Sequence, residues 1–320
     1  MSGLAWLADP FSHGFMVRAT LAIVIVGIVC GIIGVFVTLR GLAFMGDALA
    51  HAIFPGVVIA FVLGGNYLVG ALVAATLVSL GIGVIGQTGR LSNDTAIGVL
   101  FAGAFALGVA IISTQETFAR DVTGFLFGSI LGVGRDDLLL SAAIGLGVLL
   151  LMLLFRRELT TVAFDRTFAA SVGMNLWAWD QLFLLLLSLS IVVSLQTVGN
   201  ILVLAMLVTP AATARLLSDR LPVALGLAAL IGALSGVAGL YLSYYAAFAS
   251  GSSVVLVATA IFVLALLFSP KAGLVTTRVA RWLHHGHPER DRFPDRSDEI
   301  ADYASTPAAS PRLDGGMETG

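Results

Sequence analysis

The sequence predicts an all-α, polytopic membrane protein with about nine transmembrane helices, and three observations lead to this prediction. Of the 320 residues, 58% are hydrophobic and only 11% are charged, and the mean hydropathy is +1.00. Runs such as Ala19–Leu39, Asp137–Leu154 and Val254–Phe268 approach the ~20 apolar residues that a helix needs to cross a bilayer core of ~30 Å. A chain of this composition cannot cover its apolar surface in water by itself, so we place it in a lipid bilayer.

Apolar runs between charged or turn-rich breaks define the predicted spans in chain order. The first five are expected near residues 16–39, 48–64, 67–86, 96–113 and 137–155, and the last four near 177–196, 201–217, 222–247 and 253–269. The segment Gln196–Asn200, between the sixth and seventh spans, is too short for anything but a tight connection. Two connections are longer, Ser113–Asp136 and Arg156–Asp180, and long connections in a compact protein usually have a function.

The positions of the basic residues predict the orientation, because basic residues near the ends of spans are retained on the cytoplasmic side. With the N-terminus outside and the C-terminus in the cytoplasm, only Arg18, Arg120 and Arg135 lie outside. The residues then inside are Arg40, Arg90, Arg156, Arg157, Arg166, Arg215, Arg220, Lys271, Arg278, Arg281, Arg290, Arg292, Arg296 and Arg312. This asymmetry favours nine spans in that orientation.

The chain is expected to divide into three segments. Residues 1–15 are predicted to be an extracytoplasmic N-terminal segment; they lack a basic leader and a small-residue cleavage pattern, so we expect the first span to be retained. Residues 16–275 form the predicted transmembrane domain. Residues 276–320 are rich in His, Pro, Asp, Glu, Arg and Ser. That composition cannot form a core, so we predict a disordered cytoplasmic tail.

Composition and motifs also exclude several functions. The net charge is −2 and Lys271 is the only lysine, so no basic face indicates nucleic-acid binding. The sequence has no Gly-x-x-x-x-Gly-Lys-Ser/Thr phosphate loop and no HExxH motif. Any ATP hydrolysis must therefore come from another polypeptide, and the chain is not expected to be an enzyme.

Two glycine pairs, Gly27–Gly31 and Gly232–Gly236, have the spacing that lets membrane helices approach closely.

The strongest local signal is the stretch Gly41–Gly56, which begins the second predicted span. It places Asp47 and His51 four residues apart, on one face of a helix. Ionisable residues inside a membrane segment are costly and usually face a pathway or a partner. A carboxylate and an imidazole suit borderline divalent metals, and a symmetric dimer would bring four such ligands. The alternative is that Asp47 caps the helix start and His51 is an interfacial histidine that binds no metal.

This stretch, in which Gly-Asp-Ala-x-x-His-Ala is followed by Pro-Gly, resembles the signature of the zinc- and manganese-importer permeases of the ABC-transporter superfamily. The resemblance covers about residues 16–275. Further motifs that carry it are Asn93–Gly98, Leu126–Leu131, Phe164–Asp165 with Ala169 and Gly173, Thr197–Gly199 and Thr209–Arg215.

The resemblance implies a permease of the type II ABC importer fold that works as a homodimer in the bacterial plasma membrane. It implies one cytoplasmic ATP-binding subunit per copy and an extracytoplasmic metal-binding protein that delivers the ion. The transported substrate would be Zn²⁺ or Mn²⁺, and no permanently bound cofactor is expected. By the same resemblance, Asp47 and His51 lie on the metal pathway.

The predicted cytoplasmic loop at about residues 156–180 contains a segment that resembles the coupling helix of this family. The residues that match are Phe164, Asp165, Phe168, Ala169 and Gly173. We expect Phe164–Gly173 to form a short helix that docks into the ATPase. Phe164 and Phe168 are four residues apart and would present one aromatic face of that helix.

Several alternatives stay open at this stage. His284, His285 and His287 form a short His-rich tract that either binds metal or is simply solvated. Imidazole suits zinc and carboxylate also suits manganese, so these residue types do not separate the two metals. A permease for a metal chelate would keep the fold without needing Asp47 and His51 as ligands. An ion-coupled secondary transporter should show internal repeats, and the sequence shows no convincing duplication.

Overall fold

A computed structural model describes residues 9–87, 93–114 and 130–269 of the chain, and all of its regular structure within these ranges is helical. Nine helical segments in this part are long and apolar enough to cross a membrane, which confirms the predicted number of spans. The segments that fall within the nine spans are α2 (Gly14–Leu39), α3 (Met45–Ala52), α4 (Phe54–Val62), α5 (Tyr67–Gln87), α6 (Asn93–Ile112), α8 (Arg135–Leu154), α11 (Leu176–Val198), α12 (Asn200–Leu217), α13 (Leu221–Ala246) and α14 (Ser250–Phe268).

Four short elements complete the described chain. The 3-10 turns η1 (Asp9–Ser12) and η3 (Ile130–Gly132) precede α2 and α8. The helices α9 (Arg156–Phe164) and α10 (Arg166–Ser171) lie between α8 and α11. The connection predicted as a loop at about residues 156–180 is therefore mostly helical.

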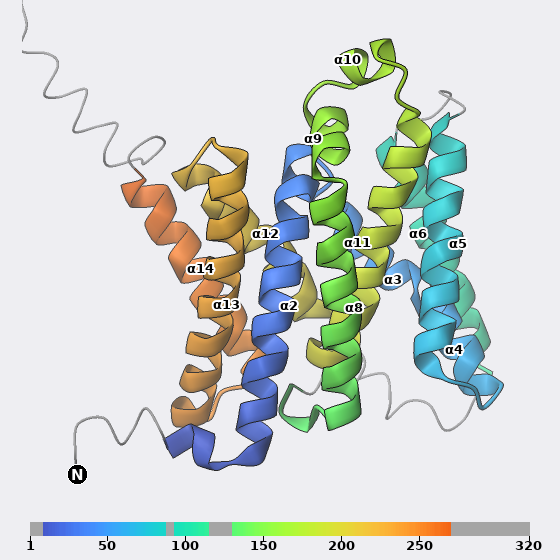
Figure 1. Cartoon of the computed structure of the whole chain (residues 1–320). Coiled ribbons are helices and arrows are strands. Elements are labelled where there is room, and N and C mark those ends of the chain that lie inside the picture. Colours follow the sequence, from blue (N-terminus) through green and yellow to red (C-terminus); the bar gives the residue numbers. More distant parts are fainter. Residues whose placement is uncertain (1–8, 88–92, 115–129, 270–320) are drawn as a thin grey trace, which may run out of the picture. The chain divides into compact units, whose positions relative to one another are not determined.

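Helix α2 lies at the centre of the bundle (Figure 1). It packs against α12 and α13 on one side and against α8 on the other, and α14 packs against α12 and α13. The helices α4, α5 and α6 pack together, and α5 contacts α11. Helix α3, which carries Asp47 and His51, contacts both α6 and α11.

The predicted glycine contacts bring α2 and α13 together. A Cβ atom added to Gly27 would lie 2.7 Å from the Gly232 carbonyl carbon, and one added to Gly31 would lie 2.8 Å from that of Ala228. Backbones this close exclude any side chain at the crossing. Small residues thus provide the tight packing that holds helices together in lipid, where the hydrophobic effect does not.

Two of the membrane segments contain or adjoin backbone breaks. The second predicted span is two helices, α3 and α4, that meet at Ile53. Pro55 explains the break, because proline lacks the N–H that would bond to the carbonyl four residues earlier. Between α11 and α12 only Gly199 intervenes, with φ of 83°, a conformation that favours glycine. The predicted tight connection at Gln196–Asn200 is confirmed.

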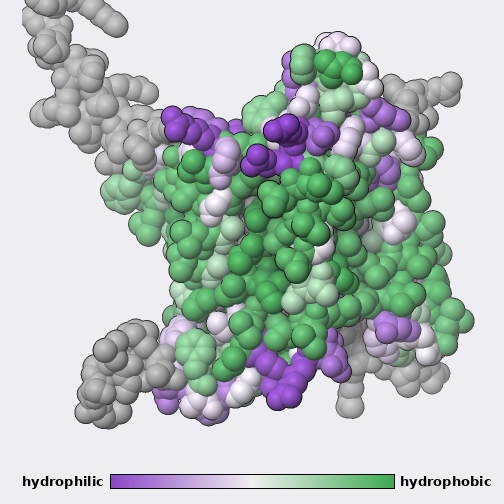
Figure 2. All heavy atoms as spheres, in the orientation of Figure 1, coloured by the Kyte–Doolittle hydropathy of each residue, from purple (hydrophilic) through white to green (hydrophobic). Residues whose placement is uncertain are grey.

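The surface of the bundle is apolar between two polar ends (Figure 2). Among the described residues, six arginines lie at the end of the bundle that carries α10, and Arg18 and Arg135 lie at the other end. The six are Arg40, Arg156, Arg157, Arg166, Arg215 and Arg220. This distribution follows the arrangement from which the orientation was predicted.

Candidate functional site

The end of α2 sets the position of α3. Gly41 has φ of 70°, and the Leu42 N–H donates to the Val37 carbonyl across 2.9 Å. This left-handed turn stops α2 and satisfies one of its last carbonyl groups. Helix α3 begins four residues later at Met45, and its first turn carries Asp47. The N-cap position is Phe44, so the alternative that Asp47 caps this helix is wrong.

The structure brings Asp47 and His51 together, as predicted. The His51 Nδ1 atom lies 2.9 Å from the Asp47 backbone oxygen and 3.3 Å from the carboxylate atom Oδ1. On the other edge of the ring, Nε2 lies 3.3 Å from the Asn200 amide nitrogen at the start of α12. The rings of Phe101 and Phe105, both on α6, stand edge-on to the imidazole with centroids 5.7 Å away.

The two side chains differ in their surroundings. Asp47 lines a cavity of about 380 Å³ together with residues of α6 and of the α2–α3 connection. Its side chain is 42% exposed, whereas that of His51 is 25% exposed and is not among the residues that line the cavity. The carboxylate therefore opens onto the cavity, and the imidazole lies behind it between α6 and α12.

The described part of one chain does not complete a metal site from acidic, histidine and cysteine side chains alone. Within residues 9–87, 93–114 and 130–269, no three such residues come close enough to hold one ion. As predicted ligands, Asp47 and His51 would supply two donors, and divalent transition metals take four to six. The remaining ligands must come from other residue types, from water or from a second copy of the chain.

Asp165 and Gly173 lie at the two ends of the short helix in the predicted coupling segment. The Asp165 carboxylate accepts a hydrogen bond from the Phe168 N–H across 2.8 Å and so caps the start of α10. Gly173, with φ of 80°, follows its end, and Ala169 is fully buried. A short helix is present, as expected, and it covers residues Arg166–Ser171.

One part of that prediction is wrong. Phe164 is the last residue of α9 and Phe168 belongs to α10, while Asp165 between them has an extended backbone (φ −143°, ψ 94°). The two rings therefore do not share one helical face, because the cap that starts α10 also separates it from α9. Both side chains are nevertheless exposed, at 59% and 55%.

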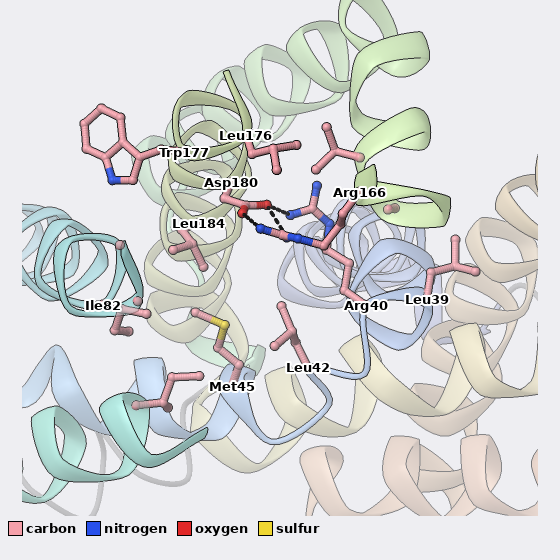
Figure 3. Close-up of a pocket in the computed structure, with 15 residues that line it drawn as sticks. Leu39, Arg40, Leu42, Met45, Ile82, Arg166, Leu176, Trp177, Asp180 and Leu184 are labelled. Carbon is pink, nitrogen blue, oxygen red and sulfur yellow. Dashed lines mark hydrogen bonds and ion pairs between the residues drawn. The ribbon is translucent and has the colours of Figure 1, made fainter. Parts of the chain in front are cut away.

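A charged cluster joins this segment to the end of α2 (Figure 3). Arg40 Nη1 donates to Asp180 Oδ1 across 2.8 Å, and Arg166 Nη2 donates to Asp180 Oδ2 across 2.8 Å. The Arg40 guanidinium also lies 4.3 Å from the centre of the Phe183 ring, a favourable cation–π distance. Burial lowers the pKa of the Arg40 side chain, and the Asp180 carboxylate opposes that change.

The charged cluster Arg40, Asp180 and Arg166 lines a cavity of about 440 Å³. This cavity and the one at Asp47 share Leu42, Met45 and Ile97 as lining residues. The space beside the predicted metal ligands is therefore next to the space beside the predicted coupling segment.

Comparisons with known proteins identify the family of the chain. Residues 12–269 match the model of a protein family described as "ABC 3 transport family". The chain belongs to the ABC 3 transport family. Within the family it is 47% identical over 277 residues to the manganese transport system membrane protein MntC of Halalkalibacterium halodurans, across 86% of this chain and 95% of that protein. It is 40% identical over 285 residues to the chelated iron transport system membrane protein YfeC of Yersinia pestis, across 89% and 97%.

A solved structure has the same fold. PsaBC from Streptococcus pneumoniae, in complex with Fab, matches with a TM-score of 0.76 and 35% identity, across 86% of this chain and 99% of that chain. The predicted fold, the resemblance to metal-importer permeases and the role as a membrane-spanning transport subunit are confirmed. The prediction that the chain is not an enzyme follows from the same membership, and the alternative of a secondary transporter is wrong.

Three residues of this ABC 3 family chain were missed as site residues by the sequence analysis: Asn200, Arg40 and Asp180. In the sequence, Asn200 is a polar residue between apolar runs, directly after the Thr197–Gly199 motif. That position could have identified it as a candidate site residue. Only the three-dimensional structure shows that Arg40 and Asp180, 140 positions apart, form an ion pair. The whole predicted tail at residues 276–320, with His284, His285 and His287, and part of the Leu126–Leu131 motif lie outside the described residues.

Proposed function

We propose that this chain is the permease of an ATP-driven manganese importer and that Mn²⁺ passes Asp47 and His51 on its way through the membrane. The observation that carries the proposal is the orientation of the His51 ring. Its Nδ1 edge is held by the Asp47 backbone oxygen, which leaves Nε2 as the ligand atom. Metal-binding histidines are usually oriented in this way, with the second ring nitrogen bonded to a carbonyl or a carboxylate.

The choice of manganese rests on two kinds of support. The relatives include manganese transport proteins, one of them 47% identical to this chain. Oxygen ligands with at most a few imidazoles suit Mn²⁺, whereas thiolates select softer metals. Cys30 is buried in α2 beside Ser194 and does not line the Asp47 cavity. The donors at this site are thus oxygen and nitrogen.

The proposed complex contains two copies of the chain, two cytoplasmic ATP-binding subunits and an extracytoplasmic metal-binding protein. The two-ligand set of one chain supports pairing, because a second copy would double it. The end of the bundle with α10 and six of the described arginines faces the cytoplasm in this proposal. The exposed rings of Phe164 and Phe168 then face the ATP-binding subunit.

The test is metal accumulation in a deletion strain that expresses the wild type or single variants, measured by elemental analysis. Asp47→Ala and His51→Ala should each lower manganese accumulation at least about tenfold. Asp136→Ala and His13→Ala are matched controls, because both residues lie at the end of the bundle opposite α10. Normal uptake in the double Asp47→Ala, His51→Ala variant would contradict the proposal. Binding of a metal chelate, but not of free Mn²⁺, by the wild type would favour a chelate permease instead.

A further inference from the structure

The proton of the His51 ring can be placed from its contacts. Nδ1 lies 2.9 Å from the Asp47 backbone oxygen, and a carbonyl oxygen only accepts hydrogen bonds. Nδ1 therefore carries the hydrogen, and in the neutral ring the lone pair is on Nε2. The lone pair that would bind a metal thus points toward Asn200, whose amide nitrogen lies 3.3 Å away.

Asn200 is buried at the start of α12. It is the first residue of α12, directly after the left-handed Gly199, and the residue is only 5% exposed. Its amide nitrogen faces Nε2, and within the described part of the chain its Oδ1 atom has no hydrogen-bond partner. Buried acceptors without a partner are rare in folded proteins and call for a physical explanation.

We propose that Asn200 is a third metal ligand and that its side-chain amide rotates by about 180° when the ion binds. In the metal-free chain the amide N–H donates to the His51 Nε2 lone pair and occupies the coordination position. Rotation brings Oδ1 to the place of the nitrogen and removes the donor from the lone pair. The inference rests on the proposed function, because it takes the ion at His51 to be the transported metal.

The geometry fits such an exchange. Two neighbouring ligands of an ion with bonds of about 2.1 Å lie roughly 3.0 Å apart in octahedral and 3.4 Å apart in tetrahedral coordination. The separation of 3.3 Å between the ring nitrogen and the amide end falls between these values. This separation is thus compatible with one ion binding both atoms while α3 and α12 stay in place.

The exchange has a consequence for selectivity. An amide oxygen is a neutral, hard donor, and with the His51 nitrogen and oxygen ligands from water or from a second copy of the chain it forms an oxygen-rich set without sulfur. Such sets suit manganese, magnesium and calcium more than the thiophilic metals. Because Asn200 competes for the lone pair only through a neutral hydrogen bond, a divalent cation displaces it readily.

The experiment titrates Mn²⁺ into the purified complex of the full-length permease with its ATP-binding subunit, and follows binding by electron paramagnetic resonance. Pulsed measurements on protein grown with ¹³C-asparagine report whether an asparagine carbonyl coordinates the ion. The ¹⁴N coupling of an imidazole in the same sample reports His51. We expect both couplings in the wild type, and in Asn200→Leu we expect loss of the ¹³C coupling and about 10- to 100-fold weaker binding.

Asn200→Asp separates a ligand from a residue that merely orients His51. Aspartate keeps the oxygen but has no N–H to donate, so a ligand role predicts binding within about threefold of the wild type or tighter. An orienting role predicts that Asn200→Asp binds as weakly as Asn200→Leu, and that result would overturn the inference. Asn66→Asp is the charge-matched control, because an Asp oxygen can still accept from the Leu68 N–H as Asn66 Oδ1 does.

Two further outcomes separate a failure of this inference from a failure of the proposed function. An imidazole coupling without an asparagine coupling in the wild type overturns the role of Asn200 and leaves the proposed function standing. Absence of both couplings, with unchanged affinity in His51→Ala, overturns the proposed function and the inference together.

Discussion

The Asp180 carboxylate accepts a hydrogen bond from Arg40 Nη1 across 2.8 Å and thereby joins α11 to the residue directly after α2. Seven positions beyond Arg40 stands Asp47. The second oxygen of the same carboxylate bonds to Arg166, the first residue of α10. The predicted coupling segment and the connection that leads to the proposed metal ligands therefore meet at a single side chain.

Removal of Asp180 should destabilise the bundle. The Arg40 side chain is only 8% exposed, and Asp180→Ala would leave its charge buried without a partner, at a loss of about 3 kcal/mol. The measurement is the melting temperature of the purified permease. Arg166→Ala is the control, because that side chain is 57% exposed and should lose at most about 1 kcal/mol. Equal melting temperatures of the two variants would contradict the prediction that Asp180 stabilises the buried charge of Arg40.

The aromatic rings beside Asp165 should affect coupling without affecting stability. Phe164 and Phe168 are both more than half exposed, so replacing both by alanine should change stability by no more than about 0.5 kcal/mol each. We expect the double variant to bind its ATP-binding subunit at least tenfold more weakly, measured with purified subunits. Phe248→Ala is the control, because Phe248 is 58% exposed at the other end of the bundle. Unchanged binding would disprove the docking role.

The crossing of α2 and α13 should be intolerant of a methyl group. Gly27→Ala would place a carbon 2.7 Å from the Gly232 backbone, and overpacking of this kind usually destabilises by about 1–3 kcal/mol. Gly147→Ala in α8 meets nothing within 4 Å, so it should be neutral or slightly stabilising. Melting of the two variants in the same detergent tests the difference. A Gly27→Ala variant as stable as Gly147→Ala would show that α2 and α13 are farther apart.

The C-terminal segment should be dispensable for transport itself. Its composition predicts disorder, and the family match ends at residue 269. Truncation after Trp282 should therefore leave the maximal uptake of manganese within about twofold of the wild type. If His284, His285 and His287 sense metal, truncation changes only the response of uptake to internal metal. Loss of uptake by a truncated protein that still reaches the membrane would contradict this prediction.

Hydropathy predicted the spans closely because a bilayer imposes both length and composition on a helix. The predicted end of the first span at residue 39 coincides with the end of α2. The break at Ile53 was not predicted, although Pro55 is visible in the sequence. Proline is often tolerated within membrane helices, so its presence alone does not fix a break, and Pro210 indeed lies inside the continuous α12.

The candidate site was predictable only in part. The spacing of Asp47 and His51 is local, and a helix converts it directly into proximity. Asn200 lies 149 positions from His51, and its contact depends on how α3 and α12 cross. The same holds for Arg40 and Asp180. Local patterns identify single residues, whereas pairs that form across the bundle depend on its packing.

In the proposed function, the charged cluster also bears on the release of the ion. Arg40, Arg166 and Asp180 together give the walls of the 440 Å³ cavity a net charge of one positive unit. A divalent cation about 10 Å away in water is repelled by about 1 kcal/mol, and the repulsion grows as water is excluded. In the proposed function, an ion that has left the protein at the α10 end would meet this positive charge again on its way back, so its re-entry from that side would be disfavoured.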